Sequence, residues 1–125
     1  MSANPLEAYK SVEKTTLSGR DLEASVLIKA AMRLQEVRSN WLDPSCGEML
    51  DEALKYNQRV WSFFQAEMSM PDNPLPPEIK QNLLALSVFV DRRIFEVMAY
   101  PAAEKLDILI NINRNIAAGL RGEAG

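Results

Sequence analysis

Residues 70–83 are MPDNPLPPEIKQNL, and this stretch decides the fold because it holds four of the chain's seven prolines. Each proline fixes its own φ and biases the preceding residue toward extended backbone, whereas a flexible linker would be rich in Gly and Ser. The stretch is therefore predicted to be a stiff corner inside one helical body. Within it, Asn73 can close a turn through its side chain, and Leu75 is expected to pack against neighbouring helices. The residue content suits either a plain connection between helices or part of a binding surface.

On both sides of this corner, apolar residues recur at steps of three and four, which is the spacing of amphipathic α-helices. This pattern predicts five helices, over about residues 5–15, 18–40, 45–68, 77–99 and 101–120. No segment alternates at a period of two, so no sheet is expected. We therefore predict an all-α fold: a single-domain bundle of about five helices spanning residues 1–125, with a core over about 5–121 and the proline-rich corner between the third and fourth helices.

Composition places the chain among ordinary globular proteins. It has 125 residues, of which 47% are hydrophobic and 25% charged. No apolar run approaches the ~18 residues of a membrane-spanning helix, and the first ten residues lack the apolar stretch of a secretory signal. The lone Cys46 cannot form an internal disulfide, which fits a reducing compartment. We expect a cytoplasmic protein without membrane insertion.

The charges argue against a nucleic-acid partner. There are 14 basic and 17 acidic residues, for a formal net charge of -3. Nucleic-acid binders concentrate basic residues on one face, but the densest basic spot, Arg92 and Arg93, is flanked by Asp91 and Glu96. Direct binding of nucleic acid is therefore not expected.

The side chains needed for catalysis are scarce. The chain has no histidine, the usual general base at neutral pH, and so nothing to activate Cys46 as a nucleophile. The sequence contains neither a Cys or His cluster with zinc-ligand spacing nor a Gly-rich phosphate loop. Acidic residues on the predicted helices are expected to form solvated faces. No enzymatic activity, metal site or cofactor is predicted.

The third predicted helix is apolar over an arc too wide for one buried face. Val60 and Trp61 are adjacent, as are Phe63 and Phe64. Aromatic and Met side chains are common in grooves that accept a partner helix, although such stripes also fill cores. Both interpretations stay open at this point.

Asparagines interrupt other apolar helix faces. Asn82 lies between Ile79 and Leu86, and three more occur in the stretch ININRNI at residues 110–116. A buried amide without partners costs ~1–3 kcal/mol. These asparagines are therefore expected either to hold helices and the corner in register or to face the backbone of a partner.

Four stretches together resemble the flagellar biosynthesis regulator FlaF family. In chain order they are LEASVLIKAAMRLQEVRSNW, LDEALKYNQRVWSFF, PDNPLPPEIKQNL with the following LSVFV, and EKLDILININRNIAAGLRG. A PDNPLP corner that leads into a QN helix, together with a terminal INRNIAAGL, is a specific combination. The resemblance covers residues 6–122.

The resemblance implies a cytoplasmic, non-enzymatic factor for flagellin production and export that works alongside the flagellin regulator FlbT. Family members look like chaperones that hold the terminal helices of flagellin. The hypothesis is that these helices lie in a groove formed by the third and fourth helices and their corner. The residues expected to contact flagellin are Tyr56, Arg59, Trp61, Phe64, Asn73, Leu75, Asn82 and Arg114.

Two alternatives remain. The first is a post-transcriptional regulator that acts on flagellin messenger RNA, either through FlbT or directly by way of Arg92, Arg93 or Arg121. Direct RNA contact would make binding strongly salt-dependent. The second is a structural subunit that only scaffolds FlbT and does not bind flagellin by itself.

Overall fold

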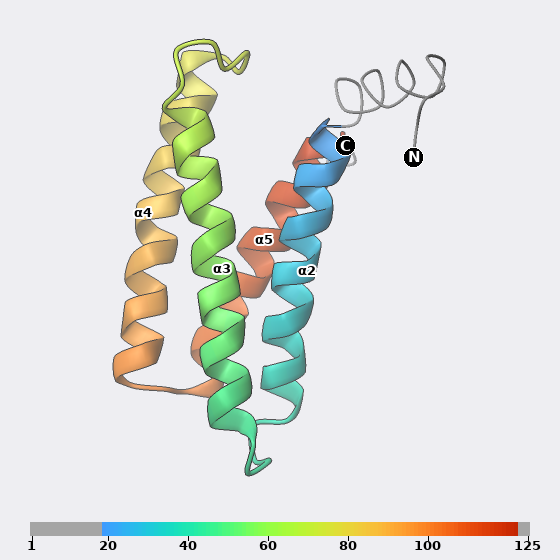
Figure 1. The fold of residues 1–125 in the computed structure, drawn as a ribbon, viewed down its shortest axis with the longest axis vertical. Coiled ribbons are helices and arrows are strands. Elements are labelled where there is room, and N and C mark those ends of the chain that lie inside the picture. Colours follow the sequence, from blue (N-terminus) through green and yellow to red (C-terminus); the bar gives the residue numbers. More distant parts are fainter. Residues whose placement is uncertain (1–18, 123–125) are drawn as a thin grey trace, which may run out of the picture.

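The computed structural model describes residues 19–122, and within them the chain forms four α-helices and no strand. These are α2 (Gly19–Ser39), α3 (Cys46–Met68), α4 (Pro77–Ala99) and α5 (Leu106–Leu120), with a short 3-10 helix, η1 (Ala103–Lys105), before α5. Consecutive helices run in opposite directions along the long axis (Figure 1). The predicted all-α class is confirmed for the described part of the chain.

The prediction of about five helices is slightly off. Four α-helices occupy residues 19–122, and the helix predicted over 5–15 lies outside the described residues. The last helix was also predicted to begin at Pro101, but α5 begins only at Leu106. Tyr100, which precedes a proline, has φ -137° and ψ 78°, and Ala102 is extended, so the chain must turn through η1 before helical angles resume.

The turn between α2 and α3 is closed by Asp43. Its carboxylate accepts hydrogen bonds from the backbone N–H of Ser45 (2.8 Å) and from the Ser45 hydroxyl (2.6 Å). These two hydrogen bonds hold the pKa of Asp43 below its usual value. Cys46 follows as the first residue of α3, where it is buried and unpaired.

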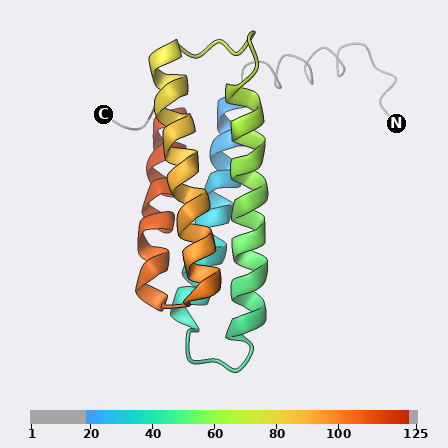
Figure 2. The ribbon, with the colours of Figure 1, turned by 90° about the vertical axis from the view of Figure 1, so that its left-hand side faces the viewer.

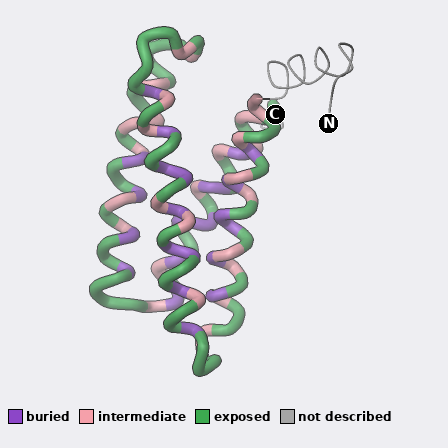
Figure 3. The backbone as a smooth tube through the Cα atoms, viewed as in Figure 1, coloured by how far each residue is buried: buried purple, intermediate pink, exposed green. Residues whose placement is uncertain are grey.

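The core lies mainly between α2, α3 and α5. α2 packs most extensively against α5 and then against α3. Small residues allow the close approach of α2 to α5, because Ala24 and Ala31 on α2 and Ala117 on α5 are all fully buried. Larger side chains such as Leu27 and Leu34 fill the remaining space. The buried positions face the interior of the bundle along each helix (Figure 3).

α4 is the least enclosed helix. It packs chiefly against α3 and makes few contacts with α5. Its C-terminal half buries Val90, Ile94 and Val97, whereas Ile79 near its start is 44% exposed and Leu83 is half-buried. The α3–α4 pair and the α2–α5 pair diverge toward the end of the bundle that carries the connection between α3 and α4 (Figure 1). Figure 2 shows this connection running across the top of α3 and α4. This divergence exposes apolar positions on α4 that the sequence pattern predicted to be buried.

Candidate functional site

A cleft of about 400 Å³ opens between the N-terminal half of α4 and the C-terminal half of α5. We call it the α4–α5 cleft. Its lining is mostly aliphatic, with two polar side chains. The lining residues are Leu75, Ile79 and Leu83 on the corner and α4; Asn115, Ile116, Gly119 and Leu120 on α5; and Arg20 on α2.

Aromatic side chains form the floor of this cleft. A narrower hollow shares Leu83, Ile116 and Leu120 with the cleft and adds Trp61 and Phe64 among its lining residues. The two rings lie 6.0 Å apart between centroids, and the side chains are 1% and 5% exposed, respectively. The structure therefore places these two predicted anchors in the core beneath the cleft, where Trp61 reaches across to Asn113 of α5. A partner would meet the aliphatic walls first.

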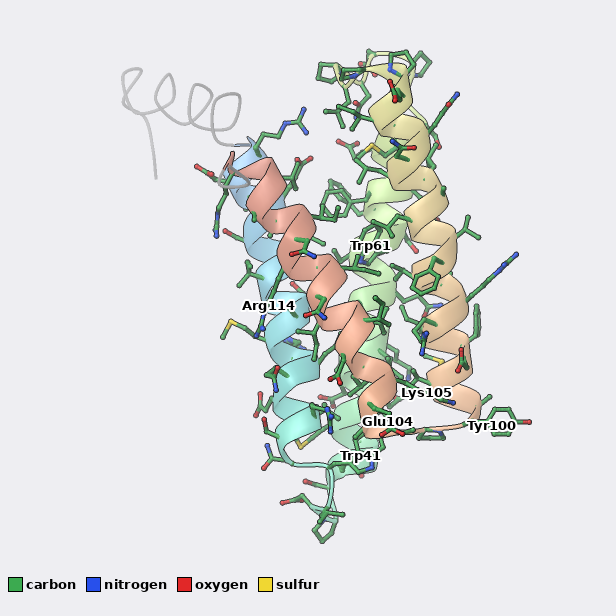
Figure 4. The ribbon with its side chains drawn as sticks, turned by 180° about the vertical axis from the view of Figure 1, so that it is seen from behind. Trp41, Trp61, Tyr100, Glu104, Lys105 and Arg114 are labelled. Carbon is green, nitrogen blue, oxygen red and sulfur yellow. The ribbon has the colours of Figure 1, made fainter. Side chains whose placement is uncertain are left out.

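The position of Trp61 is fixed by a buried series of hydrogen bonds, which we call the polar chain. Its indole N–H donates to Oδ1 of Asn113 (2.9 Å), and Nδ2 of Asn113 donates to Oδ1 of Asn57 (2.6 Å). Nδ2 of Asn57 donates in turn to the backbone carbonyls of Ala30 (3.2 Å) and Ala53 (2.9 Å). Trp61 lies between α3 and α5 in Figure 4. Asn113 therefore holds α5 in register with α3, which is one of the two roles that the sequence left open.

Asn73 organises the corner rather than facing outward. Its Nδ2 donates to the carbonyl of Glu67 in the last turn of α3 (3.0 Å), while its Oδ1 accepts from the backbone N–H of Leu75 (3.0 Å). The carbonyl of Asn73 accepts a longer bond from Nζ of Lys80 on α4 (3.4 Å). These contacts tie the corner to both helices and set Leu75 in the wall of the cleft.

Two predicted residues lie on the face that α3 shares with α2. The guanidinium of Arg33 lies over the ring of Tyr56, 4.5 Å from its centroid, with Nζ of Lys29 at 5.6 Å. Arg59 is exposed and borders a separate apolar patch near the start of α2. Neither Tyr56 nor Arg59 lines the α4–α5 cleft.

The two remaining predicted residues are also apart from the cleft lining. Asn82 is exposed on α4. Arg114 is exposed on α5 and borders a shallow depression with residues of α2, including Lys29 and Met32 (Figure 4). Of the eight predicted residues, Leu75 therefore lines the cleft directly, Trp61 and Phe64 form its floor, and Asn73 positions its wall.

Sequence reasoning did not identify most of the cleft walls. Ile79, Leu83, Ile116 and Leu120 have an apolar spacing that predicts buried helix faces, and this spacing does not show that α4 leaves α5 at this end. The single hint was Gly119 inside an otherwise apolar helical stretch, since a glycine there can mark a close approach to a ligand.

The α4–α5 cleft suits an apolar helix face better than a small polar ligand. Its side chains offer carbon surface, with Asn115 and Arg20 as hydrogen-bonding groups. Over residues 19–122, no three His, Cys, Asp or Glu side chains gather closely enough to hold a metal ion. In the same range, no helix combines the length and the apolar character that crossing a membrane requires.

Comparison with known families gives one match. The family model described as flagellar protein FlaF matches residues 5–120, which include all four described α-helices, η1 and the corner. No curated protein and no solved structure matches the chain. The family match confirms the resemblance carried by the corner and by the INRNIAAGL stretch.

Proposed function

Because the chain belongs to the FlaF family of flagellar proteins, we propose that it is a non-enzymatic, cytoplasmic chaperone that binds a terminal helix of flagellin in the α4–α5 cleft. The bound helix is kept from self-assembly until export. The observation that carries this proposal is the pair of aliphatic walls that diverge at one end of an otherwise packed bundle.

The walls have the spacing that a partner helix needs. Ile79 and Leu83 are four residues apart on α4, as are Ile116 and Leu120 on α5. Residues four apart lie on one face of a helix, so each wall presents a short apolar row. An amphipathic helix with its own apolar residues at steps of three and four can seat between such rows.

Gly119 adds no side chain to the space between the walls. No atom lies within 4 Å of the position that a Cβ would occupy there, so the smallest residue borders free space. Arg20 and Asn115 then supply donors for carboxylate or carbonyl oxygens of the partner. The cleft therefore combines apolar contact area with a few orienting hydrogen bonds.

The arrangement of arginines favours a protein partner over messenger RNA. Arg93 lies over the ring of Phe89 and 3.9 Å from Glu96, and Arg121 donates to the hydroxyl of Ser25. The C-terminal half of α4 and the end of α5 lie toward opposite ends of the bundle (Figure 1). These arginines therefore do not form one continuous track for phosphates.

The proposal is tested by calorimetric titration of the full chain with full-length flagellin and with flagellin lacking each terminal region, at low and high salt. We expect saturable binding that is lost with one terminal region and depends little on salt. Ile79→Asp should weaken binding by at least about tenfold, because a charge would be buried in an apolar wall. Val88→Asp, at a 50% exposed position of α4 outside the cleft lining, is the matched control.

Other outcomes would reject the proposal. Unchanged affinity in the Ile79→Asp variant would mean that the cleft is not the site. An absence of binding under all conditions would point to FlbT as the direct partner. Binding to flagellin messenger RNA that falls steeply with salt and requires Arg92 or Arg93 would favour the regulator hypothesis.

A further inference from the structure

A second apolar surface lies on the opposite side of the fold from the weak α4–α5 contact. We call it the α2–α3 patch, and it consists of Leu22 and Val26 on α2 and Val60 and Phe63 on α3. Leu22 is 67% exposed and Phe63 is 52% exposed. Large apolar side chains gathered at one exposed place usually mark a contact surface. We infer that the α2–α3 patch is the docking site for the chain's own residues 5–15, which lie outside the described residues.

The place where the described chain begins supports this occupant. α2 starts at Gly19, so Leu22 lies in its first turn, beside the point where residues 5–15 are attached. Residues 16–18 leave a connection of the length that joins two antiparallel helices in an αα-hairpin, about two to five residues. A helix over 5–15 that folds back along α2 would therefore reach the patch without any longer linker.

The apolar residues of the segment match the patch in register. Leu6, Tyr9 and Val12 recur at steps of three and so share one face of the predicted helix. In an antiparallel hairpin that turns near residue 17, Val12 and Leu22 are equally far from the turn, and Tyr9 falls close to the level of Val26. The apolar face of the segment thus meets the apolar face of the patch.

The charges near the turn are of both signs on each side. The half of the segment closest to the turn carries Lys10, Glu13 and Lys14. On the body, Glu23 and Arg59 border the patch, and Glu23 is paired with Arg20 at 3.7 Å. The charges near the turn therefore do not decide the direction of the segment.

The charges far from the turn are complementary. Glu7 lies in the far half of the segment. Lys29 and Arg33, further along α2, flank the ring of Tyr56 on the same α2–α3 face. The antiparallel direction therefore brings Glu7 toward the basic side chains of Lys29 and Arg33.

Docking on this face leaves the α4–α5 cleft open, so the inference is independent of flagellin binding. It is tested by amide hydrogen exchange of the full chain, compared with a synthetic peptide of residues 1–18. A helix shorter than ~12 residues is marginal alone in water, so slow exchange in 5–15 requires packing against the body. We expect exchange at least about tenfold slower in the full chain than in the peptide.

Matched variants locate the contact. The double variant Leu22→Ser/Phe63→Ser should return residues 5–15 to the exchange rates of the peptide. Met32→Ser, at a 61% exposed position of α2 outside the patch, should not. Val12→Ser, which changes the segment and leaves the bundle unaltered, should also return residues 5–15 to the exchange rates of the peptide. In every sample, slow exchange in α5 confirms that the bundle is folded.

Three results would overturn the inference. One is peptide-like exchange of 5–15 in the unmodified chain. Another is slow exchange of residues 5–15 that persists in the double variant Leu22→Ser/Phe63→Ser. If that slow exchange were then lost in Ile79→Asp, the segment would lie in the α4–α5 cleft instead. The third is protection that disappears on dilution, because the occupant would then be a second copy of the chain.

Discussion

The indole N–H of Trp61 donates a 2.9 Å hydrogen bond to Oδ1 of Asn113, and this bond joins the floor of the α4–α5 cleft to α5. Both side chains are 1% exposed, so water does not compete for the bond. Among residues 19–122, every buried side-chain nitrogen or oxygen has a hydrogen-bond partner. A polar chain satisfied in this way specifies one arrangement of the helices, because any shift of α5 would break it. The floor of the cleft is therefore fixed by the fold itself.

Asn113→Leu should lower the free energy of unfolding by about 2–4 kcal/mol, because it leaves the Trp61 N–H and the Asn57 Oδ1 buried without partners. Urea denaturation measures the change. Asn111→Leu on the exposed face of the same helix is the control and should be within about 0.5 kcal/mol of the unmodified protein. A loss below about 1 kcal/mol in Asn113→Leu would show that the polar chain does not hold the helices in register.

Asn73→Ala should loosen the corner, because its side chain joins Glu67 of α3 to the backbone of Leu75 through two hydrogen bonds. Each such bond contributes about 1 kcal/mol net, so we expect a loss of about 1–2 kcal/mol in unfolding free energy. Hydrogen exchange should accelerate at the backbone N–H of Leu75. Asp72→Ala, at the exposed neighbouring position, is the comparison, and equal effects of the two changes would remove any special role for Asn73.

Two substitutions at Gly119 test the stability of the bundle and the occupancy of the cleft separately. Gly119→Ala should raise the unfolding free energy by up to about 1 kcal/mol, since alanine favours the helix and the added Cβ meets no atom within 4 Å. Gly119→Trp should fill the α4–α5 cleft and weaken flagellin binding by at least about tenfold. Gly47→Trp, in the first turn of α3 with equally open surroundings, is the control for bulk alone. Undiminished affinity in Gly119→Trp would place the flagellin site elsewhere.

Helix boundaries with strong local signals could be predicted from the sequence. α4 was predicted over 77–99 and is observed at Pro77–Ala99, because Pro77 suits a first helical turn and Pro101 disfavours helical angles at Tyr100. α2 differs from its predicted range by one residue at each end, and α3 differs by one residue at its start only. Such signals act over a few residues of chain, so they do not depend on which helices later become neighbours.

The neighbours of each helix could not be predicted from periodicity. The apolar spacing along α4 indicates a buried Phe89, but Phe89 is 40% exposed, because α4 contacts α3 and hardly meets α5. Trp61 was expected to contact a partner, but it is buried, and Asn113 of α5 accepts a hydrogen bond from its N–H. Asn57 was overlooked because its partners lie on α2 and α5, and only the tertiary packing brings them to it. An apolar stripe predicts that a face is covered and leaves open what covers it.

The pKa of Glu23 is raised in the folded chain, so the contribution of this residue to stability should fall as the pH rises. Burial is the main cause that raises the pKa of Glu23, Arg20 opposes it, and Glu67 adds to it. The folded chain then holds a proton on Glu23 at pH values where the unfolded chain has released it, so the contribution of Glu23 to stability is largest below the usual pKa of a glutamate. This contribution declines as the pH rises through the raised pKa of the folded state.

Urea denaturation across this pH range measures the effect. The unfolding free energy of Glu23→Gln should depend less on pH than that of the unmodified protein. Glu36→Gln, at an exposed position of the same helix, should retain the pH dependence of the unmodified protein. Identical slopes in all three proteins would mean that Glu23 ionises equally in the folded and unfolded chains.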